Sequence, residues 1–218
     1  MFGRVIVLED DLVTSPYFLS YMNDALTRYE HEDQVMQIAG YMFPVELDIQ
    51  EDALMLSFVT SWGWATWRRA WKHFDAEAKG YERLVEDRLL RDRFNLGGRY
   101  NYFKMLRAYQ AGTVDSWAVR WYLNVFLRGG LALFPRKTLV SNAGFDGSGV
   151  NCAVRKIDQS PVDNMFQVLS MPQQVKVSEA QTTLLEHMPV PTLSLVSITN
   201  RLLQRLKRFP LFRSLCMS

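Results

Sequence analysis

The stretch Val5-Ile6-Val7-Leu8-Glu9-Asp10-Asp11 places four consecutive apolar residues directly before three acidic ones. A short apolar run rich in β-branched residues is typical of a strand buried on both faces of a parallel sheet. Ser15 and Pro16 then mark the start of a helix, with Ser15 as its N-cap. Apolar residues at helical spacing follow, from Tyr17 to Leu26. The order strand, acidic turn, helix predicts an α/β fold with the acids at the carboxyl end of the strand.

The remainder of the chain continues this alternation. Gly and Pro residues punctuate it, most clearly at Gly40, Gly112 and the pair at 129–130. We therefore expect a sheet with flanking helices, followed by a loop rich in Gly, Ser and Asn over 141–151. The expected strands span 35–39, 54–59, 131–134 and 138–140, and the expected helices span 65–74, 81–90, 100–111 and 116–128.

Composition excludes several classes of protein. The 218 residues are 48% hydrophobic and 22% charged, which is the balance of a globular protein. No apolar run approaches the roughly 20 residues that a membrane-spanning helix needs. Two cysteines, Cys152 and Cys216, cannot form a disulfide framework, and this indicates a reducing compartment such as the cytoplasm. Residues 1–186 sum to a charge of −3, which argues against a nucleic-acid partner.

The acidic triplet has two interpretations. Three adjacent carboxylates repel one another and raise each other's pKa unless a cation neutralises them. Carboxylate oxygens at the ligand-binding edge of an α/β sheet suit Mg²⁺ or Mn²⁺, with phosphate oxygens completing the coordination shell. Alternatively, Glu9, Asp10 and Asp11 form a solvated turn, and the two aspartates favour the dipole of the helix that follows. The triplet alone leaves both interpretations open.

All six tryptophans lie between residues 62 and 121. Indole rings beside a polar cleft can stack on sugar rings, and Gly63 between Trp62 and Trp64 permits a backbone geometry that a side chain would block. Packing is the alternative role. It is favoured for Trp67 and Trp71, four residues apart on an expected helix, whereas Trp62 and Trp64 suit packing and binding equally.

Three motifs resemble a known family when they are taken in order. They are VIVLEDDLVTSPYFLSYMNDAL, TSWGWATWRRAW and DSWAVRWYLNVFLRGGLALFPRKTLVSNAGFDGSG, and they span roughly residues 4–152. Together they resemble bacterial family 2-like glycosyltransferases, which are related to the N-acetylglucosaminyltransferase I family. The resemblance implies a GT-A fold with a Rossmann-like mixed sheet. It also implies an inverting, metal-dependent transfer from a nucleotide-sugar donor to a glycan or lipid-linked acceptor in surface polysaccharide synthesis.

The resemblance also assigns roles to the acids. It implies that Asp11 ligates Mn²⁺ or Mg²⁺ on the donor diphosphate, and that Glu9 and Asp10 contact the ribose and the sugar. Asp115 corresponds to the acid that deprotonates the acceptor hydroxyl. From the residues alone, Asp115 is an N-cap for the helix that follows.

Loops complete the site that the resemblance implies. The segment of Gly63 and Trp64, with Trp62 before it, corresponds to the lining of the sugar pocket. The loop 141–149 corresponds to a segment that closes over the donor phosphates, so Ser148 and Asn151 are candidate donor-binding residues. Asn151 stands where relatives often carry a histidine, and its amide can donate a hydrogen bond to phosphate.

Domain organisation follows from the extent of the match. Residues 1–152 are expected to be the metal and acceptor side of a GT-A domain whose N-terminal nucleotide-binding half is missing, and 153–196 to be a loosely structured extension. The basic tail, 197–218, forms an amphipathic pattern over 198–215 that suits either peripheral contact with the inner membrane or packing on the domain. A non-catalytic module that binds glycans or nucleotide sugars is the alternative function.

Overall fold

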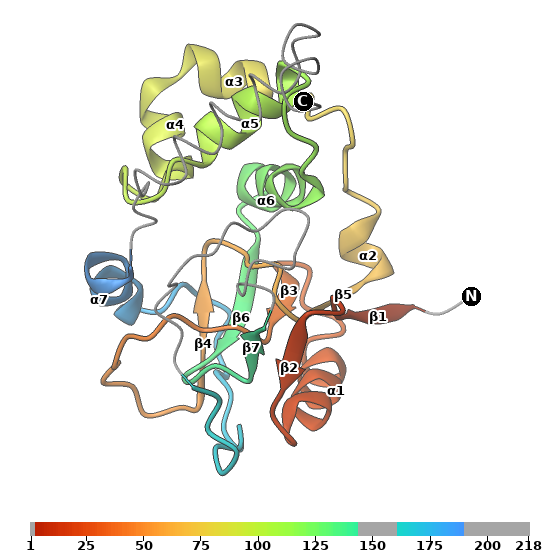
Figure 1. The fold of residues 1–218 in the computed structure, drawn as a ribbon, viewed down its shortest axis with the longest axis vertical. Coiled ribbons are helices and arrows are strands. Elements are labelled where there is room, and N and C mark those ends of the chain that lie inside the picture. Colours follow the sequence, from red (N-terminus) through yellow and green to blue (C-terminus); the bar gives the residue numbers. More distant parts are fainter. Residues whose placement is uncertain (1–2, 144–160, 190–218) are drawn as a thin grey trace, which may run out of the picture.

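A computed structural model of the chain describes residues 3–143 and 161–189, and every structural statement below concerns these ranges. They form a mixed α/β fold with a five-stranded sheet, a two-stranded sheet and flanking helices (Figure 1). This confirms the predicted α/β class with a mixed sheet. Ser148, Asn151 and the tail 197–218 lie outside the described residues.

The five-stranded sheet has the order β1-β5-β3-β6-β4. β3 and β6 are parallel, and the other neighbouring pairs are antiparallel. Because β5 is antiparallel to both β1 and β3, the carboxyl ends of β1, β3 and β6 lie at the same end of the sheet. The strands are β1 (Arg4–Val7), β3 (Val35–Ala39), β4 (Ala53–Leu56), β5 (Trp64–Trp67) and β6 (Leu131–Pro135).

Helices cover the two faces of this sheet. α1 (Phe18–Arg28) packs on β3 and β5, and its predicted apolar face is buried. α6 (Trp117–Leu127) lies over the opposite face, and α3, α4 and α5 lie beyond α6 (Figure 1). The other elements are β2 (Leu12–Thr14), α2 (Arg68–Trp71), α3 (Tyr81–Glu86), α4 (Arg88–Phe94), α5 (Tyr102–Gln110), β7 (Val140–Asn142) and α7 (Ala180–His187).

A buried polar contact connects α6 to the central strand. Gln37 on β3 is 1% exposed, and its side-chain oxygen accepts a hydrogen bond of 2.7 Å from the indole Nε1 of Trp121. The amide nitrogen of Gln37 donates to the carbonyl of Thr60 at 2.6 Å. Both ends of the buried amide are therefore satisfied, which a polar group in a core requires.

The segment after residue 160 is attached to the sheet through Asp52. One carboxylate oxygen of Asp52 accepts hydrogen bonds from the backbone N–H groups of Leu169 and Ser170 and from the Ser170 hydroxyl. The other oxygen pairs with Arg136 at 3.2 Å. Although desolvation opposes it, these donors hold the pKa of Asp52 below its ordinary value. Within the described ranges, no helix is long and apolar enough to cross a membrane.

Several predicted elements differ from the structure. β1 is an antiparallel edge strand with Val5 50% exposed, and not a strand buried on both faces of a parallel sheet. Ser15 does not cap α1, because its hydroxyl accepts from the Tyr17 N–H and the helix begins at Phe18. The helix expected over 81–90 is divided at Asp87, whose extended backbone separates α3 from α4.

The helix expected over 65–74 begins with a strand instead. Residues Trp64–Trp67 pair with both β1 and β3, and only Arg68–Trp71 is helical. All four residues of β5 are buried, because helices cover both faces of the sheet. The alternation that normally identifies a strand was therefore absent from this segment.

Candidate functional site

Two glycines bring three backbone segments together at the carboxyl end of β3. The Gly40 N–H donates to the Gly63 carbonyl at 2.7 Å, and the Gly40 carbonyl accepts from the Leu139 N–H at 2.9 Å. A Cβ on Gly40 would lie 2.6 Å from the ring of Phe18, and a Cβ on Gly63 would lie 2.9 Å from Val140. Glycine at both positions is therefore what allows the turn before β5 to contact the segment before β7.

The acidic triplet lies beside these glycines, in the turn between β1 and β2. A Cβ on Gly63 would lie 3.3 Å from the side chain of Leu8, the residue before the triplet. The backbone carbonyl of Asp11 accepts from the Ala143 N–H at 2.8 Å, and its Oδ2 accepts from the Asn142 side-chain amide at 3.1 Å. The pairing of β2 with β7 thus joins the triplet to residues 142–143.

Asp11 is the member of the triplet whose carboxylate is suited to bind a ligand. Its Oδ1 atom is buried and has no hydrogen-bond partner among the described residues. An unpartnered buried carboxylate oxygen is costly, and a bound cation or donor would satisfy it. The acids follow β1, which ends at Val7, and this confirms the prediction that they lie at the carboxyl edge of the sheet.

The Glu9 carboxyl has a raised pKa. Desolvation is the largest cause, and the charges of Asp11 and Asp10 raise the pKa further. The charge contribution is the repulsion that the triplet predicted for Glu9. A cation held at the turn would oppose it by favouring the ionised form of Glu9.

The chemistry of these donors fits a particular kind of metal site. Within residues 3–143 and 161–189, no group of three acidic, histidine or cysteine side chains could hold a metal ion by itself. Mg²⁺ commonly uses one or two carboxylates and takes its other ligands from substrate phosphates and water. Asp11, whose buried Oδ1 has no partner in the described part of the chain, fits a site of that kind and not an all-protein cage.

The tryptophans divide between the site and the core. Trp62 is half-buried in the turn and its ring meets Tyr41 edge-on, with centroids 4.6 Å apart. Trp64 lies on β5 and is 4% exposed, so the prediction that a loop carries it is wrong. Its ring stacks on Trp117 at 5.2 Å, and its buried Nε1 has no partner within the described ranges.

The two remaining tryptophans of this segment were assigned to the core. Trp67 is 3% exposed and donates from Nε1 to the Leu26 carbonyl at 2.9 Å, which confirms its packing role on a strand and not a helix. Trp71, at the end of α2, stacks on Phe74 but remains 38% exposed.

Asp115 lies in the segment that leads into α6. It lies two residues before Trp117, whose ring stacks on Trp64, and Trp64 is the register partner of Val7. Asp115 is not the N-cap of α6. Ser116 is the cap, because its hydroxyl accepts from the Val119 N–H.

The Asp115 carboxylate is held by Arg120. The Arg120 Nη2 lies 2.8 Å from the Asp115 Oδ1, and the Asp115 side chain is 88% exposed. Arg120 is itself fixed, since it donates to the carbonyls of Ser116 and Ala76 and lies 4.4 Å from the ring of Tyr109. The arrangement presents an oriented and accessible carboxylate.

Sequence reasoning identified the acids but missed the residues that position them. Gly40 was noted only as the end of a strand, and Asn142 and Arg120 were not singled out; the tertiary contacts give them their roles. Of the predicted residues, Glu9, Asp10, Asp11, Trp62 and Gly63 lie at one end of the sheet, and Trp64 lies within the sheet on β5. Asp115 lies before α6, where its carboxylate pairs with Arg120. In comparisons with known proteins, no family model and no curated protein matches the chain.

The glycine contact makes a prediction about stability. Gly63 and Gly112 both have positive φ, at +57° and +67°, but only Gly63 is crowded. We expect Gly63→Ala to lower the free energy of unfolding by about 2–4 kcal/mol, and Gly112→Ala by about 1 kcal/mol. Urea denaturation monitored by circular dichroism measures both. Equal losses in the two variants would show that crowding at Gly63 is unimportant.

The raised pKa of Glu9 predicts a pH-dependent effect. A carboxyl whose pKa is higher in the folded state loses stability as pH rises above its ordinary value of 4.5. We expect Glu9→Gln to remove this loss and to raise the free energy of unfolding by about 0.5 kcal/mol at neutral pH. Below about pH 4 the difference should disappear. Glu186→Gln, at an exposed carboxyl on α7, is the control, and a wild type more stable than Glu9→Gln at neutral pH would contradict the prediction.

Proposed function

We propose that the chain is a metal-dependent, inverting glycosyltransferase of GT-A type that uses a nucleotide-sugar donor. The observation that carries the proposal is the joining of Asp11, the Gly63 turn and Asn142 at the carboxyl end of β3. Ligands of open α/β sheets bind at this edge. The three sequence motifs that resemble family 2-like glycosyltransferases each contribute a residue to this region, which supports the proposal.

Asp11 and its neighbours would hold the donor. Asp11, whose buried Oδ1 has no partner among the described residues, would ligate Mn²⁺ or Mg²⁺, and the Asn142 amide orients its Oδ2. When bound, the metal supplies positive charge that stabilises the leaving diphosphate. Glu9 and Asp10 would accept hydrogen bonds from hydroxyl groups of the ribose and the sugar. Trp62 would contribute an apolar face to the sugar pocket.

Asp115 would act as the general base. In an inverting transfer, one carboxylate removes the proton from the acceptor hydroxyl. The hydroxyl oxygen then attacks the anomeric carbon, and the nucleoside diphosphate leaves from the opposite side. Arg120 engages one oxygen of Asp115 and fixes its direction. Such positioning matters because a small displacement of the base strongly lowers the rate of the reaction. Arg120 is therefore a positioning residue.

The acceptor that suits this proposal is a glycan or a lipid-linked glycan of a cell-surface polysaccharide. Peripheral contact with the inner membrane through 198–215 belongs to the same proposal and would keep a cytoplasmic enzyme beside a lipid-linked acceptor. That segment lies outside the described residues.

Titration of nucleotide sugars with and without Mn²⁺ tests the proposal. A calorimetric panel of uridine, guanosine and thymidine diphosphate sugars should contain at least one that binds only with the metal. Asp11→Ala should weaken that binding by about 100-fold or more. Asp115→Asn should leave donor affinity unchanged but lower the rate of transfer or donor hydrolysis by about 10²–10⁴-fold. Asp92→Asn, at an exposed acid on α4, is the matched control.

The outcomes separate the enzyme from its alternative. Metal-dependent donor binding that no acceptor converts to transfer, with Asp115→Asn without effect, would indicate a non-catalytic binding module. Absence of metal-dependent binding to every donor in the panel would refute the proposal. Equal losses in Asp11→Ala and Asp92→Asn would also refute it, because they would place the donor elsewhere.

A further inference from the structure

A hollow lies at the opposite end of the sheet from the acidic turn. It has a volume of about 280 Å³ and is lined by residues that precede β3 and β6 and by residues of α2. Gln34 and Gly130 immediately precede the two parallel strands, and the Leu131 N–H donates to the Gln34 carbonyl at 2.7 Å. The candidate functional site lies beyond the carboxyl ends of these strands, so the two sites are separated by the length of β3.

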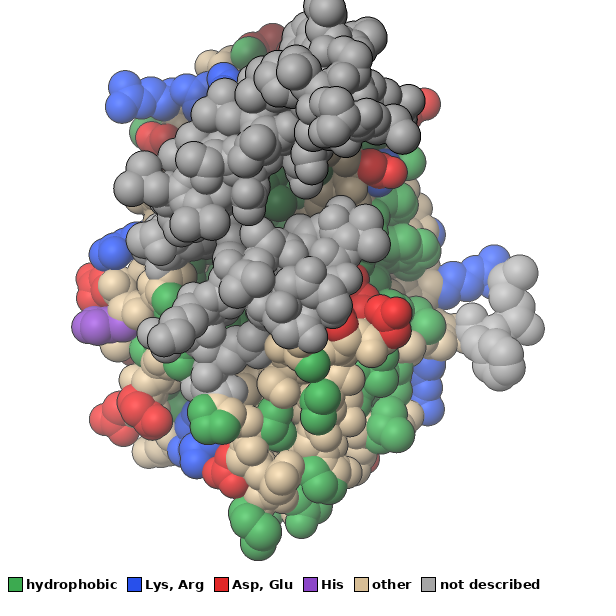
Figure 2. Space-filling view, viewed as in Figure 1, with side chains coloured by type: hydrophobic (Ala, Val, Ile, Leu, Met, Phe, Trp, Pro, Cys, Tyr) green, Lys and Arg blue, Asp and Glu red, His purple; other side chains and the backbone are tan. Residues whose placement is uncertain are grey.

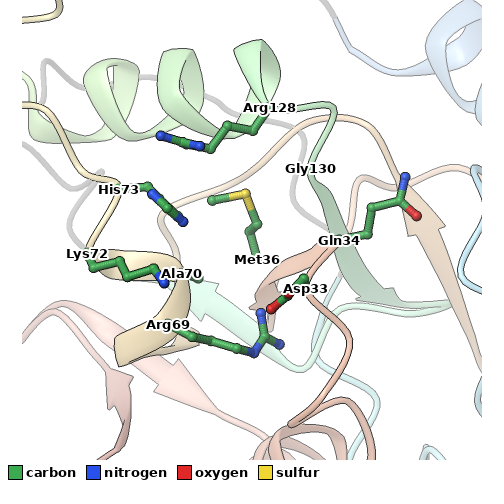
Figure 3. A pocket seen from close by; sticks show the side chains of 9 residues that line it. All are labelled: Asp33, Gln34, Met36, Arg69, Ala70, Lys72, His73, Arg128 and Gly130. Atoms are coloured by element: carbon green, nitrogen blue, oxygen red, sulfur yellow. The ribbon is translucent and has the colours of Figure 1, made fainter.

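Cationic side chains from two elements converge on this hollow. Figure 3 shows Arg69 and Lys72 of the α2 segment, the ring of His73 and the guanidinium of Arg128 around the same side of Met36. Asp33 is the acid that lines it, and its carboxylate lies beside Arg69. On the face drawn in Figure 2, by contrast, the basic side chains of the described residues lie apart, with acidic ones among them.

The cations differ in how firmly they are held. Arg69 is fixed, because its Nε and Nη2 donate to the carbonyls of Glu30 and Tyr29 at 2.7 Å and its guanidinium lies 4.2 Å from the ring of Trp67. Lys72 and Arg128 form no ion pair with a carboxylate of the described residues. The hollow therefore has one rigid cationic wall and two cations available to an incoming anion.

The floor of the hollow is apolar and close to backbone. Met36, Ala70 and Gly130 line it and are buried. A Cβ on Gly130 would lie 2.5 Å from the Met36 sulfur, so the backbone approaches the floor where a side chain could not. Cations over an apolar floor suit a compact oxyanion, because a low local dielectric strengthens charge-assisted hydrogen bonds.

We propose that this hollow binds the phosphate group of a phosphate monoester. Among the lining residues, and with His73 neutral, the cations Arg69, Lys72 and Arg128 outnumber the one acid, Asp33, which favours an anionic ligand. Glu32 and Glu30 also act on Arg69 from outside the lining, so Lys72 and Arg128 carry most of the attraction. Arginine guanidinium groups bind phosphate through paired N–H donors, and lysine adds a point charge. The volume accommodates a phosphate with a small substituent.

His73 gives the binding a pH dependence. Desolvation lowers its pKa from 6.5, and the charges of Arg128 and Lys72 lower it further, while Asp33 opposes them. An anion in the hollow screens those cations and favours the protonated imidazole. Anion affinity should therefore rise as pH falls and His73 becomes protonated.

Sulfate is the probe for this site, because it remains a dianion across the range in which His73 titrates. Titration into ¹⁵N-labelled protein should shift the amide resonances of Ala70 and Gly130 saturably. Lys72→Gln and Arg128→Gln should each weaken binding by about 10-fold. His73→Gln should abolish the increase in affinity at lower pH. Lys104→Gln, at an exposed lysine on α5, should bind as the wild type does.

Competition identifies the source of the phosphate. Displacement of sulfate by glycerol 1-phosphate supports a soluble phosphate ester as the ligand, and displacement only by phosphatidylcholine vesicles containing phosphatidic acid supports a lipid headgroup. Displacement by neither would overturn the proposal. Amide shifts that do not saturate would also overturn it. So would a Lys104→Gln variant that binds sulfate as weakly as Arg128→Gln does. Both results would indicate a general attraction of sulfate to basic residues.

Discussion

The close approach of Gly40 and Gly63 is the constraint on which the rest of this structure depends. Their hydrogen bond of 2.7 Å lies where a side chain on either residue would meet Phe18 or Val140. Because the backbones touch, the end of β3, the turn before β5 and the start of β7 converge on one point. The acidic turn is then carried to the same place by the pairing of β1 with β5 and of β2 with β7.

The two ends of the sheet differ in charge. At the carboxyl end, three acids lie together, and one buried oxygen of the Asp11 carboxylate has no partner among the described residues. At the amino end, cations from the α2 segment and from the end of α6 surround an apolar floor. A cation-assisted donor site and an anion site, separated by β3, are what these charges favour. The proposed transferase chemistry uses the first and leaves the second free for a different ligand.

Apolar patterning predicted elements of two kinds. α1 was recognised because Phe18, Met22 and Leu26 recur at helical spacing beside exposed residues, and β3 and β6 were recognised as short apolar runs although both are fully buried. β5 was missed because it continues directly into α2 at Arg68, with no Gly or Pro between them. The burial of β1 was overestimated, because an apolar run does not reveal whether its strand lies at the edge of a sheet or in the interior. The site acids could be found from sequence, but Asn142 and Arg120 are ordinary residues until the fold brings them beside Asp11 and Asp115.

The central claim is that a divalent cation and a nucleoside diphosphate bind together at the acidic turn. Paramagnetic broadening by Mn²⁺ measures this most directly, with uridine, guanosine or thymidine diphosphate added to ¹⁵N-labelled protein. We expect that, with at least one of these nucleotides, substoichiometric Mn²⁺ broadens the amide resonances of Asp11, Gly63 and Asn142. Those of Ala70 and Gly130, at the other end of the sheet, should stay sharp. Broadening that begins at Ala70 and Gly130, or that is uniform over the protein with every nucleotide, would contradict the account.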